Sequence, residues 1–306
     1  MLDVARLRVL REVARHGSLT RAAAALSYTP SALSQQIAVL EREAGALLLE
    51  RHARGVRLTE AGRALVRHTE RVLTELRAAE STLAAISAAE GGRLRFGSFT
   101  TANATLMPLA VRAFLRERPA VEVELVEADR DEAMAAVAAH ELDLALVYEF
   151  PAAPLRVPAT VEARHLLADP LHIALPPDHR LAGRERIRLA DLAGERWIQG
   201  VHRGSTIDVL PEACRAAGFE PRIAFRTDDQ MTVRGLVAAG LGVALVPFLT
   251  LPATAPDLVV RRLSEPAPTR TVMTATPAGR YRLPAAAAMI EHLRAVAASL
   301  GEVSPP

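Results

Sequence analysis

A stretch of 28 residues without glycine or proline, residues 63–90, constrains the fold of this chain more than any other feature. Leu65 and Val72 begin a run of apolar residues spaced by seven, which is the repeat of a helix that pairs with a second helix. Thr59 is placed to cap this helix, and Gly91 follows as a stop. One helix of this length extends about 42 Å. The stretch therefore separates a small N-terminal part of the chain, here called the head, from a larger C-terminal part, here called the body.

The basic residues are unevenly distributed along the chain. It has no lysine, so all 37 basic residues are arginine, and the formal net charge is +2. Residues 1–67 hold eleven arginines and six acidic residues, a net charge of +5, whereas residues 68–306 hold 26 arginines and 29 acidic residues, a net charge of −3. A basic head on a mildly acidic body predicts that the head alone meets a polyanion. The alternative is that this uneven distribution of charge arose by chance in an arginine-rich chain. The residue pattern within the head must decide between the two interpretations.

The composition excludes several classes of enzyme. Schiff-base enzymes and P-loop NTPases need a lysine, which this chain lacks. Cys214 is the single cysteine, so neither an internal disulfide nor a thiolate zinc cluster is possible. His140-Glu141 lacks the second histidine of a zinc protease motif, and the chain has no Gly-x-Ser-x-Gly elbow. We expect no enzymatic activity, no cofactor and no metal.

The chain also lacks the pattern of a membrane or secreted protein. Residues 1–10 carry three charges and have no continuous apolar core, so we expect no signal peptide. Residues 235–256 are uncharged and long enough to span a bilayer, but glycine and proline interrupt them repeatedly. This segment is better interpreted as a helix, a turn and a buried strand. A single thiol fits a reducing compartment, and we expect a cytoplasmic protein.

The head has the pattern of three short helices. Apolar residues at helical spacing predict a first helix that ends at Gly17. Ser18 is placed to cap a second helix over residues 19–26. Thr29 caps a third helix that runs to residue 41, with Pro30 at the first helical position, where a missing N–H costs nothing. Two helices joined by such a short turn predict a helix-turn-helix.

Polar side chains remain on the outer face of the third predicted helix. Serine and glutamine hydrogen-bond base edges in the major groove. Residues 47–58 follow as a predicted hairpin with Gly55 at its turn, and its arginines suit phosphates or the minor groove. A solvated polar face is the alternative for any one of these side chains. The predicted DNA-binding residues are Thr29, Pro30, Ser31, Ser34, Gln35, Gln36, Arg51, Arg54 and Arg57.

A combined motif runs through the first 65 residues. It comprises Ala22-Ala23, Leu26, Thr29 to Ile37, Leu40-Glu41, Gly45, Leu48 to Arg51 and Leu58 to Gly62. With these residues the head resembles the winged helix-turn-helix of LysR-type transcriptional regulators, which implies operator DNA as the partner. The chain departs from that family at Leu49, where phenylalanine is usual, and at Gln35, where arginine or lysine is frequent. Leu49 is still apolar, and we expect Gln35 to change operator preference and not the class of protein.

The linker helix would leave its apolar seam in water if it stood alone. A second copy of the chain would bury the seam, and twofold symmetry also fits paired operator half-sites. Packing against the chain's own body is the alternative. We predict a DNA-binding domain over residues 1–58, a linker and dimerisation helix over 59–90 and an effector-binding domain over 91–306.

The body alternates strands and helices, which predicts parallel sheets with helices on both faces. The predicted strands occupy residues 93–99, 121–126, 142–148, 171–175, 197–198, 223–225, 243–246 and 270–275. The predicted helices occupy residues 102–118, 131–140, 207–217, 231–239 and 285–300. The fold class is therefore α/β, with two lobes in the body: lobe I spans residues 91–165 and 266–306, and lobe II spans residues 166–265.

Several body segments, among them Pro177-Asp178-His179 and residues 239–247, resemble the LysR-family effector domain, which is similar to periplasmic binding proteins. Ligands of such folds bind between the lobes, at the carboxyl ends of strands. Each candidate residue there has the alternative of being an ordinary cap or loop residue. The predicted effector-binding residues are Ser98, Thr100, Thr101, Asn103, Tyr148, His202, Arg203, Ser205, Thr206, Asp228, Gln230 and Pro247.

The resemblance implies a transcription factor whose partners are double-stranded operator DNA, a small-molecule effector and further copies of the chain in a dimer or tetramer, with RNA polymerase as a further candidate. His202 and Arg203, beside predicted helix N-termini, favour an effector that bears a carboxylate. Two rival functions remain: a small-molecule-binding protein without DNA function, which would not need the basic head, and a cofactor-free enzyme, which would need an acid–base pair that the sequence lacks. The sequence names neither the effector nor the regulated genes.

Overall fold

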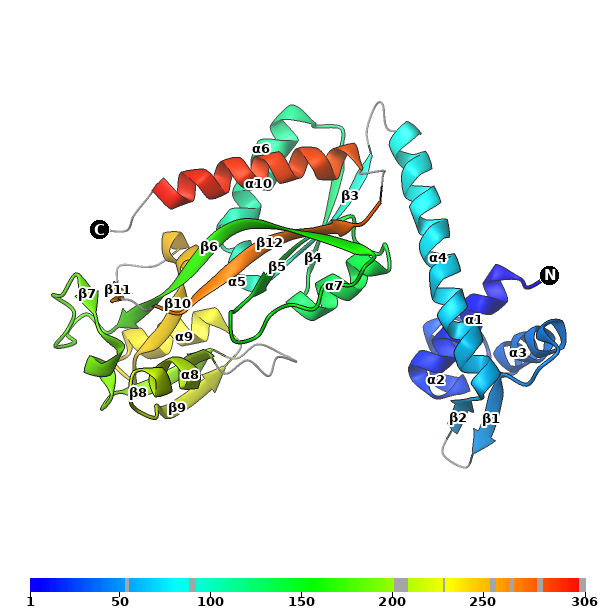
Figure 1. Cartoon of the computed structure of the whole chain (residues 1–306), viewed down its shortest axis with the longest axis horizontal. Coiled ribbons are helices and arrows are strands. Elements are labelled where there is room, and N and C mark those ends of the chain that lie inside the picture. Colours follow the sequence, from blue (N-terminus) through cyan, green and yellow to red (C-terminus); the bar gives the residue numbers. More distant parts are fainter. Residues whose placement is uncertain are drawn as a thin grey trace. The chain divides into compact units, whose positions relative to one another are not determined.

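The computed structural model describes residues 1–52, 55–87, 92–200, 209–227, 229–253, 257–264, 267–279 and 283–302. The chain divides into two compact units, residues 1–83 and residues 84–306. Figure 1 shows the helices and strands of each unit.

The first unit begins with three helices: α1 (Val4–His16), α2 (Leu19–Ala25) and α3 (Pro30–Ala44). The side chains of Ser18 and Thr29 cap α2 and α3, each accepting a backbone N–H from the first turn. Gly17 ends α1 with φ 59°, a conformation that glycine adopts without strain. Leu33 and Leu40 of α3 are fully buried against the other helices. The predicted caps and the predicted inner face of the third helix are confirmed.

A two-stranded wing follows, formed by β1 (Leu49–His52) and β2 (Gly55–Leu58), and then α4 (Glu60–Ser87). The hydroxyl of Thr59 accepts the N–H of Gly62 at 2.9 Å and donates to the carbonyl of Leu47 at 2.7 Å. The same residue therefore begins α4 and ties its first turn to the wing. Gly62 permits this close approach, because a Cβ there would lie 2.2 Å from the carbonyl oxygen of Leu48.

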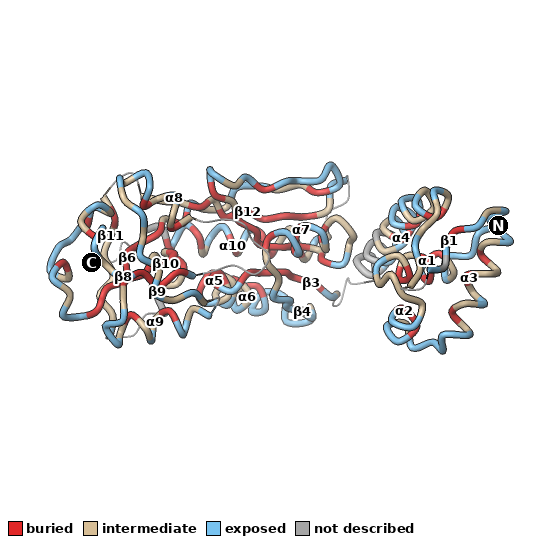
Figure 2. Tube along the Cα trace, turned by 90° about the horizontal axis from the view of Figure 1, so that it is seen from below, coloured by how far each residue is buried: buried red, intermediate tan, exposed pale blue. Residues whose placement is uncertain are grey.

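The second unit is built on a mixed sheet with the strand order β4-β3-β5-β12-β6-β11-β7. Its strands are β3 (Arg93–Ser98), β4 (Glu122–Glu127), β5 (Leu144–Glu149), β6 (Val161–Leu175), β7 (Arg186–Ile187), β11 (Val259–Leu263) and β12 (Thr269–Pro277). The predicted parallel pairing holds for β3 with β4 and β5, whereas β12 is antiparallel to β5 and β6. Figure 2 shows β12 buried along most of its length.

Helices cover both faces of the first lobe's sheet. On one face α6 (Leu106–Glu117) and α10 (Pro284–Glu302) pack side by side (Figure 1), and α7 (Arg130–Ala138) covers the other. Adjacent residues of β5 supply the two cores: Leu146 packs with the first pair of helices and Val147 with α7. This is the alternation that a strand buried on both faces requires.

The long strand β6 carries the chain from one lobe to the other. Its first part pairs with β12, and its last part pairs with β11 and with β10 (Ala244–Pro247). The second lobe adds a parallel pair, β8 (Arg196–Gly200) and β9 (Arg222–Thr227), which a bridge between Trp197 and Val243 joins to the rest. Its helices are α8 (Val209–Ala216), α9 (Gln230–Ala238) and two short 3-10 turns, η1 (Leu189–Leu192) and η2 (Phe248–Ala253).

Two predicted elements were wrong in extent by several residues, and two strands were missed. The helix expected over residues 102–118 is divided into α5 (Thr100–Asn103) and α6, because Thr105 has non-helical angles and Pro108 has no N–H to donate to the preceding turn. The strand expected over residues 171–175 begins ten residues earlier, at Val161. Strands β7 and β11 were not predicted, since arginines break up their apolar pattern.

Candidate DNA-binding face and effector cavity

The N-terminal turns of α3 present hydroxyl and amide groups to solvent. Ser31 and Gln35 are exposed one turn apart on the same face of the helix. Thr29 and Pro30 are also exposed, and Ser34 and Gln36 are half-buried. The opposite side of the helix, through Leu33 and Ile37, is in the core of the first unit.

Two contacts hold the wing against the helix-turn-helix. Oε1 of Glu41, near the end of α3, accepts the backbone N–H groups of Leu48 at 2.8 Å and Leu49 at 3.2 Å. The N–H of Val56 donates to the carbonyl of Gly17 at 3.2 Å. A Cβ on Gly55 would lie 2.5 Å from that carbonyl oxygen, so a glycine is required where the wing crosses the turn between α1 and α2. The spacing between α3 and the wing is thus fixed within the unit.

The predicted wing arginines lie on the hairpin. Arg57 is exposed on β2 and stands opposite Glu50, and Arg51 on β1 stands opposite Val56. Arg54 lies outside the described residues. Sequence reasoning did not select Tyr28, which is 44% exposed directly before the cap of α3. An exposed aromatic side chain beside a polar helix face is the signal that identifies it.

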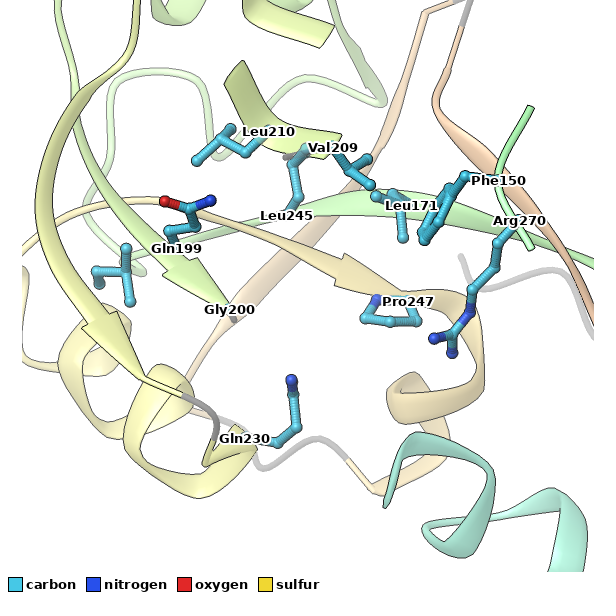
Figure 3. A pocket seen from close by; sticks show the side chains of 11 residues that line it. Phe150, Leu171, Gln199, Gly200, Val209, Leu210, Gln230, Leu245, Pro247 and Arg270 are labelled. Atoms are coloured by element: carbon cyan, nitrogen blue, oxygen red, sulfur yellow. The ribbon is translucent and has the colours of Figure 1, made fainter. Parts of the chain in front are cut away.

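A cavity of about 60 Å³, here called the inner cavity, lies in the second unit (Figure 3). Its polar lining consists of Gln199 on β8, Gln230 at the start of α9 and Arg270 on β12, with Gly200 between the two amides. Its apolar lining consists of Phe150, Leu171, Ile198, Val209, Leu210, Leu245 and Pro247.

Arg270 is the most tightly held group of this lining. Its Nε donates to Oδ2 of Asp169 at 2.8 Å, and its Nη2 donates to the hydroxyl of Thr101. The guanidinium centre lies 5.0 Å from the ring of Phe99 and 4.9 Å from the ring of Tyr148, distances at which a cation is attracted to an aromatic face. The charge of Arg270 is therefore matched by a carboxylate and by two rings.

Asp169 and Tyr148 extend this network. The second carboxylate oxygen of Asp169 accepts the N–H of Leu249 on η2 at 3.2 Å. The hydroxyl of Tyr148 donates to Asp129 at 3.1 Å, and burial raises the pKa of this phenol. Strands β5, β6 and β12 are thereby linked to α5 and η2 around one buried cation.

The predicted effector-binding residues have different positions. Gln230 and Pro247 line the inner cavity. Thr101 and Tyr148 are buried and hold Arg270, and Ser98 is buried at the end of β3. Thr100 and Asn103 both donate to the carboxylate of Glu127, at 3.1 Å and 3.0 Å. His202, Arg203, Ser205, Thr206 and Asp228 lie outside the described residues.

The predicted effector-binding residues did not include the rest of this lining, Arg270 on β12 and Leu171 on β6 among them. Both lie inside long strands, and it is the pairing of β6 with β12 that brings them near β8 and α9. The signal in the sequence was an arginine within a strand that carries no other charged residue, because a buried charge in such a position needs a partner.

Comparison with known proteins places both units in one family. Residues 4–63 match the bacterial regulatory helix-turn-helix proteins of the lysR family, and residues 87–298 match the LysR substrate binding domain. The chain belongs to the LysR family of transcriptional regulators, a class of DNA-binding proteins and not of enzymes. The mixed α/β fold, with a helix-turn-helix unit followed by a substrate-binding unit, is the fold of that family.

Named relatives are similar over most of their length. The hydrogen peroxide-inducible genes activator of Pectobacterium carotovorum subsp. carotovorum is 32% identical over 254 residues, which covers 82% of each chain. The transcriptional dual regulator GltC of Bacillus subtilis is 28% identical over 286 residues, covering 93% of this chain and 94% of the relative.

Solved structures agree with this assignment. Full-length OxyR from Pseudomonas aeruginosa has a TM-score of 0.70 at 25% identity, covering 100% of this chain and 99% of the other. CbnR in complex with its target DNA has a TM-score of 0.63 at 25% identity, covering 96% of this chain and all of CbnR. Among the described residues, no helix has the length and apolar character needed to cross a membrane.

Proposed function

We propose that this regulator binds operator DNA through α3 and the wing, and that a small molecule bound in the second unit controls this binding. The observation that carries the proposal is the exposed polar face of α3, which Glu41 ties to an arginine-bearing wing. Ser31, Ser34 and Gln35 suit base edges, and Arg57 suits a phosphate. A DNA partner also implies action in the cytoplasm and contact with RNA polymerase at a promoter.

The proposed domains are those expected from the sequence: DNA binding by residues 1–58, a linker helix over 59–90 and effector binding by 91–306. The inner cavity supports an effector site between the lobes, because strands of both lobes line it. Asp169 matches the charge of Arg270, and Oε1 of Gln199 accepts the Nε of Arg226 at 3.1 Å, so the side-chain amide of Gln230 is the described group of this lining best suited to hydrogen-bond a ligand. An effector with a carboxylate remains our proposal, for which His202 and Arg203 are the reason.

We further propose that the chain works as an even oligomer, a dimer or a tetramer. Val72, Leu76 and Leu83 are 41%, 42% and 64% exposed along α4, at the heptad positions expected from the sequence. In the second unit, Leu125 and Val126 are exposed on the edge strand β4, 46% and 38%. Apolar side chains of this size on a helix seam and a sheet edge favour partners of the same chain.

A thiol-based response is a second candidate, which the peroxide-related names of several relatives suggest. The chain argues against it. Cys214 is its single cysteine and is fully buried in the second lobe, and burial raises the pKa of the thiol to about 12. A reactive thiol needs exposure and a lowered pKa. We therefore propose a non-covalent effector.

The test is a fluorescence anisotropy titration of the full chain on the DNA upstream of its own gene, with a scrambled duplex as the control. Preference for the upstream DNA supports the DNA-binding proposal, and equal affinity for both contradicts it. Metabolites that raise the melting temperature in a thermal-shift screen are then added to the titration. An effector must change operator affinity, because binding at coupled sites is reciprocal.

A further inference from the structure

A second cavity, here called the outer cavity, lies beside the inner cavity. Its volume of about 480 Å³ is within the usual range for small-molecule sites, about 300–1,000 Å³. Alanines of α8 form one wall, and the segments that follow β5 and precede β12 form the other. These walls include Pro151, Ala152, Ala213, Ala216, Ala217 and Pro268.

The lining of the outer cavity is predominantly apolar. Arg188 and Glu212 are the charged residues of its described lining. The guanidinium of Arg188 is bound to Oδ1 of Asp191 at 2.8 Å, so its charge has a partner outside the cavity. Short alanine side chains leave the space open between the walls. Glu212 is exposed to solvent, so its carboxylate can stay hydrated, and the rest of the lining suits an uncharged, apolar group.

Two side chains separate the two cavities. Phe150 and Val209 line both of them, and no other residue of the described linings is shared. Phe150 is 5% exposed and packs edge-on against Tyr148, and Val209 is the first residue of α8. Figure 3 shows Phe150 and Val209 on the side of the inner cavity that lies away from Gln230. The inner cavity, which has three polar side chains, and the predominantly apolar outer cavity thus share these two side chains.

We propose that the effector is an amphipathic molecule that occupies both cavities, with a polar head among Gln199, Gln230 and Arg270 and a ring-sized apolar body in the outer cavity. This inference rests on the proposed effector function. The inner cavity, at about 60 Å³, is far smaller than the outer cavity, at about 480 Å³, so the larger apolar body of such a molecule needs the outer cavity. Rotation of Phe150 and Val209 joins the two spaces.

The experiment measures dissociation constants on the full-length chain for two pairs of probes. Each pair differs by one phenyl ring: butanoate with 4-phenylbutanoate, and butanamide with 4-phenylbutanamide. One pair carries the head group, carboxylate or amide, that binds in the inner cavity. In that pair the phenyl ring should increase affinity by roughly tenfold or more, because it buries apolar surface. Ala213→Trp fills the outer cavity and should reduce that gain to less than about threefold. Gln230→Ala should weaken both members of a pair and leave the gain unchanged.

Matched variants keep the result interpretable. Ala193→Trp adds the same side chain at an exposed position outside both linings, and it should retain the phenyl gain. Ala217→Trp, on the same wall as Ala213, replaces Ala213→Trp if that variant does not fold. The inference is wrong if the phenyl ring adds no affinity in either pair, or if the gain survives in both Ala213→Trp and Ala217→Trp. If the gain is present but operator affinity does not change, the two-cavity site stands and the regulatory role proposed above fails.

Discussion

The guanidinium of Arg270 and the carboxylate of Asp169 lie 2.7 Å apart, and their side chains are 1% and 0% exposed. The two residues are direct partners in the pairing of β12 with β6. Thr101 and Leu249 complete their hydrogen bonds, and these two residues come from α5 and η2. One buried ion pair therefore joins the segments that surround the inner cavity.

Removal of either partner leaves an uncompensated buried charge. Arg270→Met and Asp169→Leu should each lower the free energy of unfolding by about 3–5 kcal/mol, and the double variant should recover much of the loss. Urea denaturation measures both effects. Arg164→Met is the control, since Arg164 pairs with Glu162 on the same strand but is 51% exposed, and its loss should cost below about 1 kcal/mol. Single variants as stable as this control would contradict the role of the pair.

The buried thiol of Cys214 makes stability depend on pH. Its pKa is raised from 9.0 to about 12 in the folded chain, chiefly by burial. The unfolded chain therefore loses this proton first, and the contribution of the thiol to stability is lost as pH rises from about 9 to about 12. Between pH 8 and 11, stability should fall more steeply in the wild type than in Cys214→Ala. Parallel curves would contradict the raised pKa.

The same burial predicts that the thiol is inert. Iodoacetamide at pH 8 should label Cys214 in urea but not in the native chain, because only the thiolate reacts. Hydrogen peroxide should leave operator affinity unchanged. A peroxide-dependent change that disappears in Cys214→Ala would restore the thiol-based alternative.

Local chemistry made the first unit predictable. Ser18, Thr29 and Pro30 have preferences that depend on their nearest neighbours in the chain, and each occupies the helix position expected of it. The role of Glu41 could not be predicted in this way. Its carboxylate binds the N–H groups of Leu48 and Leu49, a contact that exists only after the chain has turned back.

The second unit was predictable in its elements and not in its cavity. Alternating patterns placed most strands, yet the predicted extent of β6 was too short, because Glu162, Arg164 and His165 interrupt the apolar pattern of its first part. The cavity lining is set by the pairing of β6 with β12, over about 100 residues of sequence separation. Periodicity carries no information about such distant partners.

The exposed seam of α4 predicts the oligomeric state. Val72→Ser with Leu76→Ser should shift the chain in sedimentation velocity towards the mass of one copy, 32.8 kDa, because the apolar seam that favours pairing is lost. Glu70→Ser, an exposed polar position on the same helix, is the control and should leave the oligomer intact. An unchanged mass for the double serine variant would show that other surfaces hold the copies together.

Arg57 on the wing should contribute affinity without sequence preference. Arg57→Ala should weaken binding to operator and scrambled DNA by the same factor. It should also reduce the slope of log affinity against log salt by about 1, as expected for one lost phosphate contact. Anisotropy titrations between 50 and 200 mM salt, about the range over which phosphate contacts dominate, measure this slope. A loss confined to the operator would assign Arg57 to base readout instead.

The placement of α3 in a DNA groove is tested most directly by replacing Ser31, Ser34 and Gln35 with alanine together and measuring affinity for operator and scrambled duplexes. Each base contact contributes about 1–3 kcal/mol of discrimination. We expect the triple variant to keep the fold and its affinity for scrambled DNA, and to lose at least about tenfold in operator affinity. A folded triple variant that prefers the operator as strongly as the wild type would contradict the account.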